Sequence, residues 1–222
     1  HPTTTKADGH LLEYFRQTFG AGGGASVPIP PFGLTATGGV INDYSDGPVI
    51  YRSHIFTTSG TFNVTSLGDL PAAVDYLVVA GGGGGGASQS GGGGAGGLRT
   101  NLSGHPLATN NPSWTAAVAS YAVTVGAGGH GAINAPQATG SDGSNSVLAH
   151  PSTPITALGG GGGGSWKPGA AAENGRPGGS GGGGGRVQGS QTQGTGGSGS
   201  YSGSPANPQP YRQGYDGGDT GT

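Results

Sequence analysis

The chain has 222 residues, of which 55 are glycine and 16 are proline, and its apolar fraction of 31% is small for an ordinary globular core. Charged residues make up 8% and the net charge is −2, so the chain has no basic stripe that would bind nucleic acid. The sequence contains no cysteine, which excludes disulfides and thiolate metal sites, and no apolar run long enough to insert into a membrane.

Residues 1–33 are expected to form a segment for attachment or oligomerisation. Asp8 can cap a short helix over residues 11–19, in which Leu11, Phe15 and Phe19 share one face at i, i+4 and i+8. Because so short a helix is unstable in isolation, it must dock on its own domain, on copies of itself or on another protein. A glycine- and proline-rich hinge follows over residues 20–31.

Residues 34–80 are predicted to form a small β domain. Short segments rich in Val, Ile, Phe, Tyr and Thr, separated by turn residues, predict its strands. These segments are residues 40–41, 49–52, 55–57, 61–65 and 74–79. Residues 42–47 are predicted to form a turn, and Ser59-Gly60 is predicted to close a hairpin between residues 55–57 and 61–65.

Nearly pure glycine tracts dominate residues 81–222. They cover residues 81–86, 91–94, 159–164 and 181–185. Predicted strands at residues 74–79 and 155–158 run directly into two of the tracts, and a further strand is expected at residues 146–149. An alternating strand at residues 121–125 likewise enters a glycine-rich stretch. The tracts have no Gly-X-Y period, which excludes collagen.

Uninterrupted glycine favours the threefold extended helix known as polyglycine II. Such helices have free N–H groups, so neighbouring copies can hydrogen-bond sideways in a bundle whose centre admits no Cβ. The predicted fold is therefore mostly β, with a glycine-rich array of polyglycine II helices after residue 80 and one short N-terminal helix. The alternative is a set of flexible linkers. The expected scaffold glycines bound three of the tracts: Gly81, Gly86, Gly159, Gly164, Gly181 and Gly185.

No pattern in the sequence supports catalysis, a metal site or a cofactor. The six histidines lack metal-ligand spacing. The phosphate-binding pattern G-x-G-x-x-G fits any glycine hexamer and so carries no information here. No G-x-S-x-G follows a predicted strand with a partner acid. We expect a protein that is not an enzyme.

Aromatic residues in the glycine-rich half are candidates for receptor binding. They are Trp114, Trp166, Tyr201, Tyr211 and Tyr215. Aromatic side chains in loops on a rigid scaffold are typical of surfaces that bind a saccharide or a protein. The alternative is that these rings cap the ends of the bundle and supply apolar packing that glycine cannot.

One stretch resembles a known family. Residues 56–65 read F-T-T-S-G-T-F-N-V-T, and residues 75–81 read D-Y-L-V-V-A-G at the start of the first glycine hexamer. This pattern resembles the glycine-rich domain of bacteriophage virion proteins, notably tail-fibre and structural proteins of marine cyanophages. The resemblance covers roughly residues 34–200, and residues 35–41 and 121–129 look like further members of the pattern.

The resemblance implies a non-enzymatic fibre or adhesin component of a phage virion that takes part in host attachment. Its expected partners are copies of itself, other virion proteins and a bacterial surface saccharide or protein, and its expected location is the virion. Some phage adhesins with similar domains carry recognition loops at one end of a polyglycine helix bundle. The alternative is a subunit of a self-assembling extracellular filament that binds no receptor.

Overall fold

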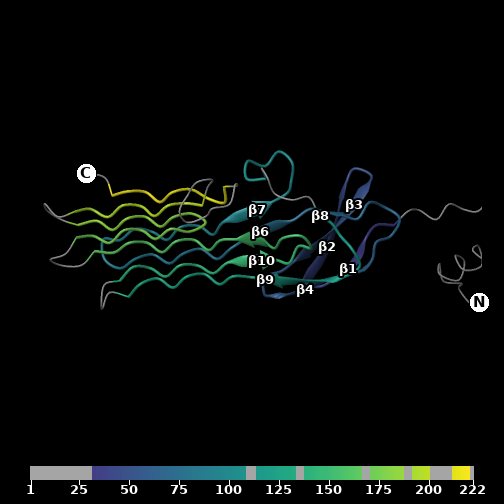
Figure 1. Cartoon of the computed structure of the whole chain (residues 1–222), viewed down its shortest axis with the longest axis horizontal. Coiled ribbons are helices and arrows are strands. Elements are labelled where there is room, and N and C mark those ends of the chain that lie inside the picture. Colours follow the sequence, from purple (N-terminus) through teal and green to yellow (C-terminus); the bar gives the residue numbers. More distant parts are fainter. Residues whose placement is uncertain are drawn as a thin grey trace, which may run out of the picture.

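The computed structural model describes residues 32–108, 114–133, 138–166, 171–187, 192–200 and 212–220. This part of the chain is elongated, with the strands toward one end and long wavy segments running side by side toward the other (Figure 1). The predicted helix at residues 11–19, with Leu11, Phe15 and Phe19, lies outside the described residues.

The described part contains antiparallel strands and no helix, which confirms the prediction that the fold is mostly β. The strands are β1 (Thr35–Thr37), β2 (Val40–Asp46), β3 (Val49–Ile55), β4 (Gly60–Ser66), β5 (Ala73–Val74), β6 (Leu77–Val79), β7 (Leu98–Thr100), β8 (Trp114–Thr115), β9 (Ser120–Thr124), β10 (Ser146–Leu148) and β11 (Ile155–Ala157).

The largest sheet has five strands in the order β1-β4-β9-β10-β11. Its strands come from the predicted β domain at residues 34–80 and from the glycine-rich half, so both regions contribute to one sheet. Three two-stranded sheets, β2–β3, β5–β8 and β6–β7, complete the described strands.

The predicted hairpin across Ser59-Gly60 is wrong. Strand β3 pairs with β2 along its whole length, from Val40 opposite Ile55 to Asp46 opposite Val49. Strand β4 instead pairs with β1 and β9. The pairing of β4 in the large sheet buries its apolar side chains, because Phe62 and Val64 are 7% and 1% exposed there.

The turn predicted at residues 42–47 is also wrong, because β2 continues to Asp46. Cross-strand contacts outweigh the turn preference of this polar segment: the Tyr44 and Tyr51 rings stack at 5.3 Å, and Asp43 pairs with Arg52. The chain reverses instead at Gly47, whose φ of 58° suits glycine.

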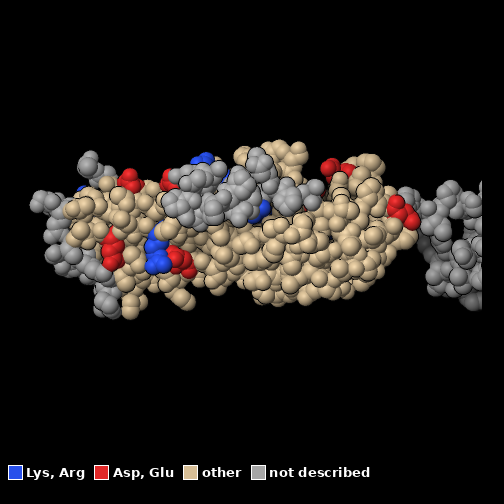
Figure 2. Space-filling model, viewed as in Figure 1, with Lys and Arg blue, Asp and Glu red and all other residues tan. Residues whose placement is uncertain are grey.

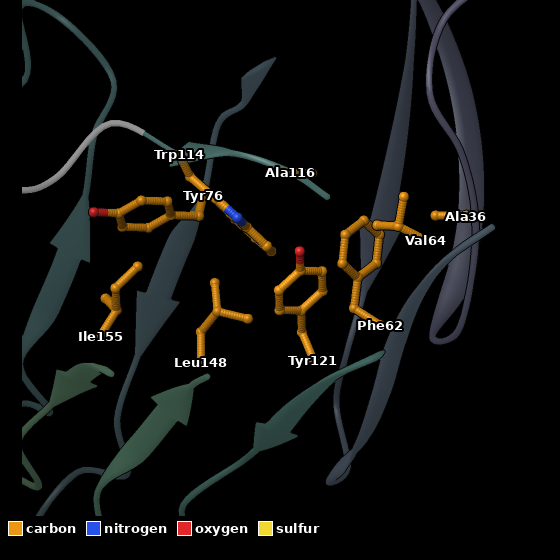
Figure 3. Packing of buried hydrophobic residues seen from close by; sticks show 9 residues of the cluster. All are labelled: Ala36, Phe62, Val64, Tyr76, Trp114, Ala116, Tyr121, Leu148 and Ile155. Atoms are coloured by element: carbon orange, nitrogen blue, oxygen red, sulfur yellow. The ribbon is translucent and has the colours of Figure 1, made fainter. Parts of the chain in front are cut away.

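The hydrophobic core lies against one face of the five-stranded sheet and combines four aromatic rings with aliphatic side chains (Figure 3). Phe62 of β4, Trp114 of β8 and Tyr121 of β9 contact one another edge-on or tilted, at centroid distances of 4.9–6.3 Å. Leu148 of β10 and Ile155 of β11 extend the core toward the glycine-rich segments. The core thus joins the strands that lead into and out of the glycine tracts.

Candidate functional site

The glycine-rich segments form one hydrogen-bonded body, which we call the glycine bundle. Its segments are residues 80–87, 91–97, 126–132, 138–145, 158–165, 172–178, 179–187, 192–200 and 213–220. In Figure 1 the bundle is the set of wavy lines, and its segments 80–87, 91–97, 126–132, 138–145 and 158–165 adjoin strands β6, β7, β9, β10 and β11. These short strands therefore set where those five segments enter or leave the bundle.

Segment 80–87 shows how the segments pair. Every third amide donates to segment 91–97, which runs antiparallel to it. These bonds join Ala80 N to Gly97 O, Gly83 N to Gly94 O and Gly86 N to Gly91 O at 3.1, 2.8 and 3.1 Å. The amides one residue later donate to a different antiparallel segment. These bonds join Gly81 N to Ser144 O, Gly84 N to Ser141 O and Ala87 N to Ala138 O at 3.1, 2.8 and 3.1 Å.

The carbonyl groups of the same segment contact two more neighbours, both parallel to it. Its four acceptor bonds join Gly160 N to Gly81 O, Gly163 N to Gly84 O, Gly129 N to Gly82 O and Ala132 N to Gly85 O, at 2.8–2.9 Å. A β-strand bonds two neighbours with a two-residue period. Segment 80–87 bonds four neighbours with a three-residue period, so the bundle is not a β-sheet.

Close backbone approach explains why the scaffold positions are glycine. A Cβ at any of the six predicted scaffold glycines would overlap the carbonyl oxygen of a neighbouring segment. The overlaps are Gly81 with Ala127, Gly86 with Gly164, Gly159 with Gly143, Gly164 with Glu173, Gly181 with Gly197, and Gly185 with Ser165. At all six positions, the backbone of another segment leaves no room for a side chain.

Sequence reasoning missed the segments that are not glycine-pure. Segments 138–145, 172–178 and 192–200 carry glycine at every third position, as in the pairs Gly140/Gly143, Gly175/Gly178 and Gly194/Gly197. A Cβ at each of these six positions would also overlap backbone of another segment. The G-x-x-G spacing is the signal that could have identified them, because a three-residue repeat places those glycines on one inward side.

A few glycines of the bundle face outward. The nearest atoms to a Cβ at Gly82, Gly85, Gly128 or Gly131 lie 3.6–3.9 Å away, which is ordinary van der Waals contact. Gly82 and Gly85 also donate no amide hydrogen bond to a described residue. The fold of the single chain therefore does not require glycine at these four positions.

The end of the bundle away from the sheets, which we call the tip, carries the described reversal at residues 87–90 between segments 80–87 and 91–97 (Figure 1). At this end Gly91 donates to Gly164 at 3.0 Å, and Ala132 donates to Gly85 at 2.9 Å. Residues 134–137, 167–170 and 188–191 lie outside the described residues.

The structure separates the candidate receptor-binding aromatics. Trp166 is half-buried and follows Ser165 at the tip. Tyr215 is 57% exposed, lies under the Arg212 guanidinium at 4.3 Å, and accepts a bond from Gly181 near the sheet end of the bundle. Tyr201 and Tyr211 lie outside the described residues.

Trp114 corrects the expectation that all five aromatics lie in loops. It belongs to strand β8 and is 3% exposed, because its indole packs on Phe62 and Tyr121 in the core. A surface ligand does not reach this ring in the observed fold, so Trp114 is not retained as a receptor-binding candidate.

One family model, described as a glycine-rich domain, matches residues 57–222. The chain belongs to this glycine-rich domain family. No curated protein and no solved structure matches it. The matched range begins just before β4 and includes the whole glycine bundle, so the family pattern coincides with the strands and segments described above.

Charges are sparse on the glycine-rich domain. Figure 2 shows mostly uncharged surface on this side, with one group of adjacent acidic and basic side chains on the bundle. Asp142 accepts from Arg176 Nε at 2.8 Å and from the Gly162 amide at 2.9 Å, so it joins three segments. The hydrogen bond to Asp142 raises the pKa of Arg176 above its ordinary value. No sequence motif links these two residues.

The described residues contain no group of three or more His, Cys, Asp or Glu side chains placed to hold a metal ion. No helix among them is long and apolar enough to cross a membrane.

Proposed function

We propose that the segments of the glycine bundle are polyglycine II helices, and that the protein is a non-enzymatic fibre or adhesin component of a bacteriophage virion that takes part in host attachment. The three-residue hydrogen-bond repeat of segment 80–87, with four neighbours around one backbone, supports the polyglycine II form. The proposed virion role rests on the resemblance of residues 34–200 to phage virion proteins. Polyglycine II is the backbone form with three residues per turn and free lateral donors.

The proposed scaffold is rigid because its bonds are shared between segments. Ordering a glycine backbone costs about 1–2 kcal/mol per residue, and one net hydrogen bond contributes about 0.5–1.5 kcal/mol. A lone tract gains too little, whereas Gly81 and Gly84 each donate one bond and accept another from different segments. Packing of several tracts against one another thus offsets the high entropy cost of ordering glycine, and the resulting bundle is stiff.

The tip is the proposed receptor-binding end. The described reversal at the tip, residues 87–90, carries no scaffold glycine, so its sequence can change without disturbing the bundle that holds it in place. Trp166 supplies an indole at this end that is suited to stacking on a sugar ring or packing on a protein. The proposed ligand is a bacterial surface saccharide or protein.

The opposite end is the proposed attachment end. There the strands would contact other virion proteins or further copies of the chain. In this proposal the receptor-binding end faces outward on the virion and the sheet end faces inward.

Binding of the purified full chain to bacterial surface polysaccharides and outer-membrane fractions on an array tests the proposal. The Trp166→Ala variant should weaken any observed binding by about tenfold or more, since one desolvated aromatic contact contributes about 1–3 kcal/mol. The Tyr215→Ala variant, on the side of the bundle, is the matched control and should bind as the wild type does. Equal loss in both variants, or no binding to any fraction, would count against a receptor-binding tip.

A filament subunit without a receptor is the second candidate, and the outward glycines favour it. At Gly82, Gly85, Gly128 and Gly131 the backbone faces solvent without side chains, so the backbone of a second copy could approach it closely. Electron microscopy of the same purified protein separates the two functions. Long helical polymers formed without other virion proteins would support the filament.

A further inference from the structure

The hairpin β2–β3 carries apolar side chains that nothing in the described part covers. Cross-strand pairing puts alternate residue pairs on one side of the hairpin. One side, which we call the tyrosine face, carries the apolar residues Val40, Tyr44, Val49, Tyr51 and Ile55 together with the polar residues Asn42, Asp46 and Ser53. The five apolar residues are 42–64% exposed.

The exposure is unusual for a hairpin of this kind. Strands β2 and β3 pair only with each other among the described strands, and a lone two-stranded hairpin in water is marginally stable at best. The stacked rings of Tyr44 and Tyr51 form one apolar cluster on this face, and Val40 and Ile55 form a second, with the polar pair Asn42 and Ser53 between them. Exposed apolar clusters of this kind are typical of a surface that is covered in the complete molecule.

The N-terminal part of the chain starts close to this hairpin. In Figure 1, the described chain begins near the same end of the molecule as β2 and β3. Only eight residues separate Phe32 from Val40, which limits their distance to about 29 Å. Phe32 is fixed to the body of the molecule because its carbonyl accepts a bond from the Asp69 amide at 2.8 Å.

We propose that residues 11–19 dock as a helix on the tyrosine face of the same chain. Leu11, Phe15 and Phe19 form a stripe at i, i+4 and i+8, which spans about 12 Å in a helix. Val40 and Tyr44 are four strand residues apart, about 13 Å. Leu11 and Phe19 are therefore spaced to reach the two apolar clusters of the tyrosine face, and neither the helix nor the hairpin is stable alone.

The hinge at residues 20–31 permits this docking within one chain. From Phe19 to Phe32 the chain can span up to about 45 Å, which exceeds the distance limit between Phe32 and the hairpin. A short linker keeps the tethered segment at an effective concentration in the millimolar range. Docking within the chain therefore prevails over docking on a second copy at ordinary protein concentrations. The inference stands independently of the proposed virion role.

Amide hydrogen exchange of the full chain, followed by mass spectrometry at micromolar concentration, tests the proposal. Peptides covering residues 11–19 and 40–55 should exchange at least about tenfold more slowly than unstructured peptides. Phe15→Ser, which leaves the hairpin sequence intact, should remove the protection of residues 11–19 and lower that of residues 40–55. Tyr44→Ser should also remove the protection of residues 11–19.

Ile50→Ser is the matched control, because Ile50 lies on the opposite side of the same hairpin and is 77% exposed. It should leave the protection of residues 11–19 unchanged. Unprotected residues 11–19 in the wild type would overturn the proposal, as would protection that survives Tyr44→Ser. Protection that rises with protein concentration would assign the tyrosine face to a second copy and overturn docking within the chain.

Discussion

Gly84 and Gly85 are consecutive residues of one tract that meet different surroundings. A Cβ at Gly84 would overlap the carbonyl of His130, whereas the nearest atom to a Cβ at Gly85 lies 3.9 Å away. Neither residue has a positive φ, so both tolerate the backbone conformation of alanine. The sequence G-G-G-G-G-G does not distinguish them; only the identity of the neighbouring segments does.

Gly84→Ala should therefore lower the free energy of unfolding by about 1–3 kcal/mol or more. The added Cβ can be accommodated only if the backbone at His130 moves, because no flexible side chain is there to yield. Gly85→Ala should be neutral, or stabilising by up to about 1 kcal/mol, because it restricts only the unfolded chain. Urea unfolding of the two variants beside the wild type measures both effects. Equal midpoints would mean that residues 81–86 are not packed as the structure places them.

At the scale of the element, the hairpin β2–β3 carries a charge pair on the side opposite its tyrosine face. Arg52 donates to both carboxylate oxygens of Asp43 at 2.7 Å. These hydrogen bonds lower the pKa of Asp43 below its ordinary value of 3.8. The folded hairpin therefore favours the ionised form, and this contribution to stability is complete above pH 3.8 and is lost as the pH falls through the lower folded pKa.

An NMR titration of the Asp43 side-chain carboxyl carbon should give a midpoint below 3.8. In Arg52→Gln the midpoint should rise toward that value, because the charged donor is gone. The pair is solvent-exposed, so the overall unfolding free energy should change little. A midpoint that stays the same after Arg52→Gln would contradict the cause assigned here.

Sequence reasoning worked best for elements whose own residues determine them. The β-branched and aromatic runs predicted β4, β9, β10 and β11 to within a residue or two, whereas the two strands predicted at residues 49–52 and 55–57 are one strand, β3. Strands β1, β7 and β8 were missed because each is only two or three residues long and depends on its partner. The false hairpin at Ser59-Gly60 had the same origin, since the competing partner, β9, lies some 60 residues away in sequence.

The candidate site was partly predictable for the same physical reason. Uninterrupted glycine indicated backbone-to-backbone packing, and the six scaffold glycines meet backbone as expected. The segments with glycine at every third position were not recognised, because their other residues look like ordinary loops until the neighbours are known. The place of Trp114 in the core could not be predicted from its glycine- and proline-rich flanks.

In the whole molecule, the sheet region is stabilised by its core and the bundle by its hydrogen bonds. Rings from β4, β8 and β9 pack together in the core, and strands β9, β10 and β11 connect this core to the bundle. Beyond the strands, the described segments are held mainly by amide-to-carbonyl bonds between segments. Stiffness along the bundle should then follow from hydrogen bonding, not from apolar burial.

Lateral hydrogen bonds with a three-residue period order the glycine tract at residues 81–86. Residue-resolved amide exchange by NMR across residues 81–87 tests this order. Exchange should be slow at Gly81, Gly83, Gly84 and Gly86, whose amides are bonded, and fast at Gly82 and Gly85, which have no described partner. Uniform exchange at unstructured rates across residues 81–87 would mean that the tract is a flexible linker.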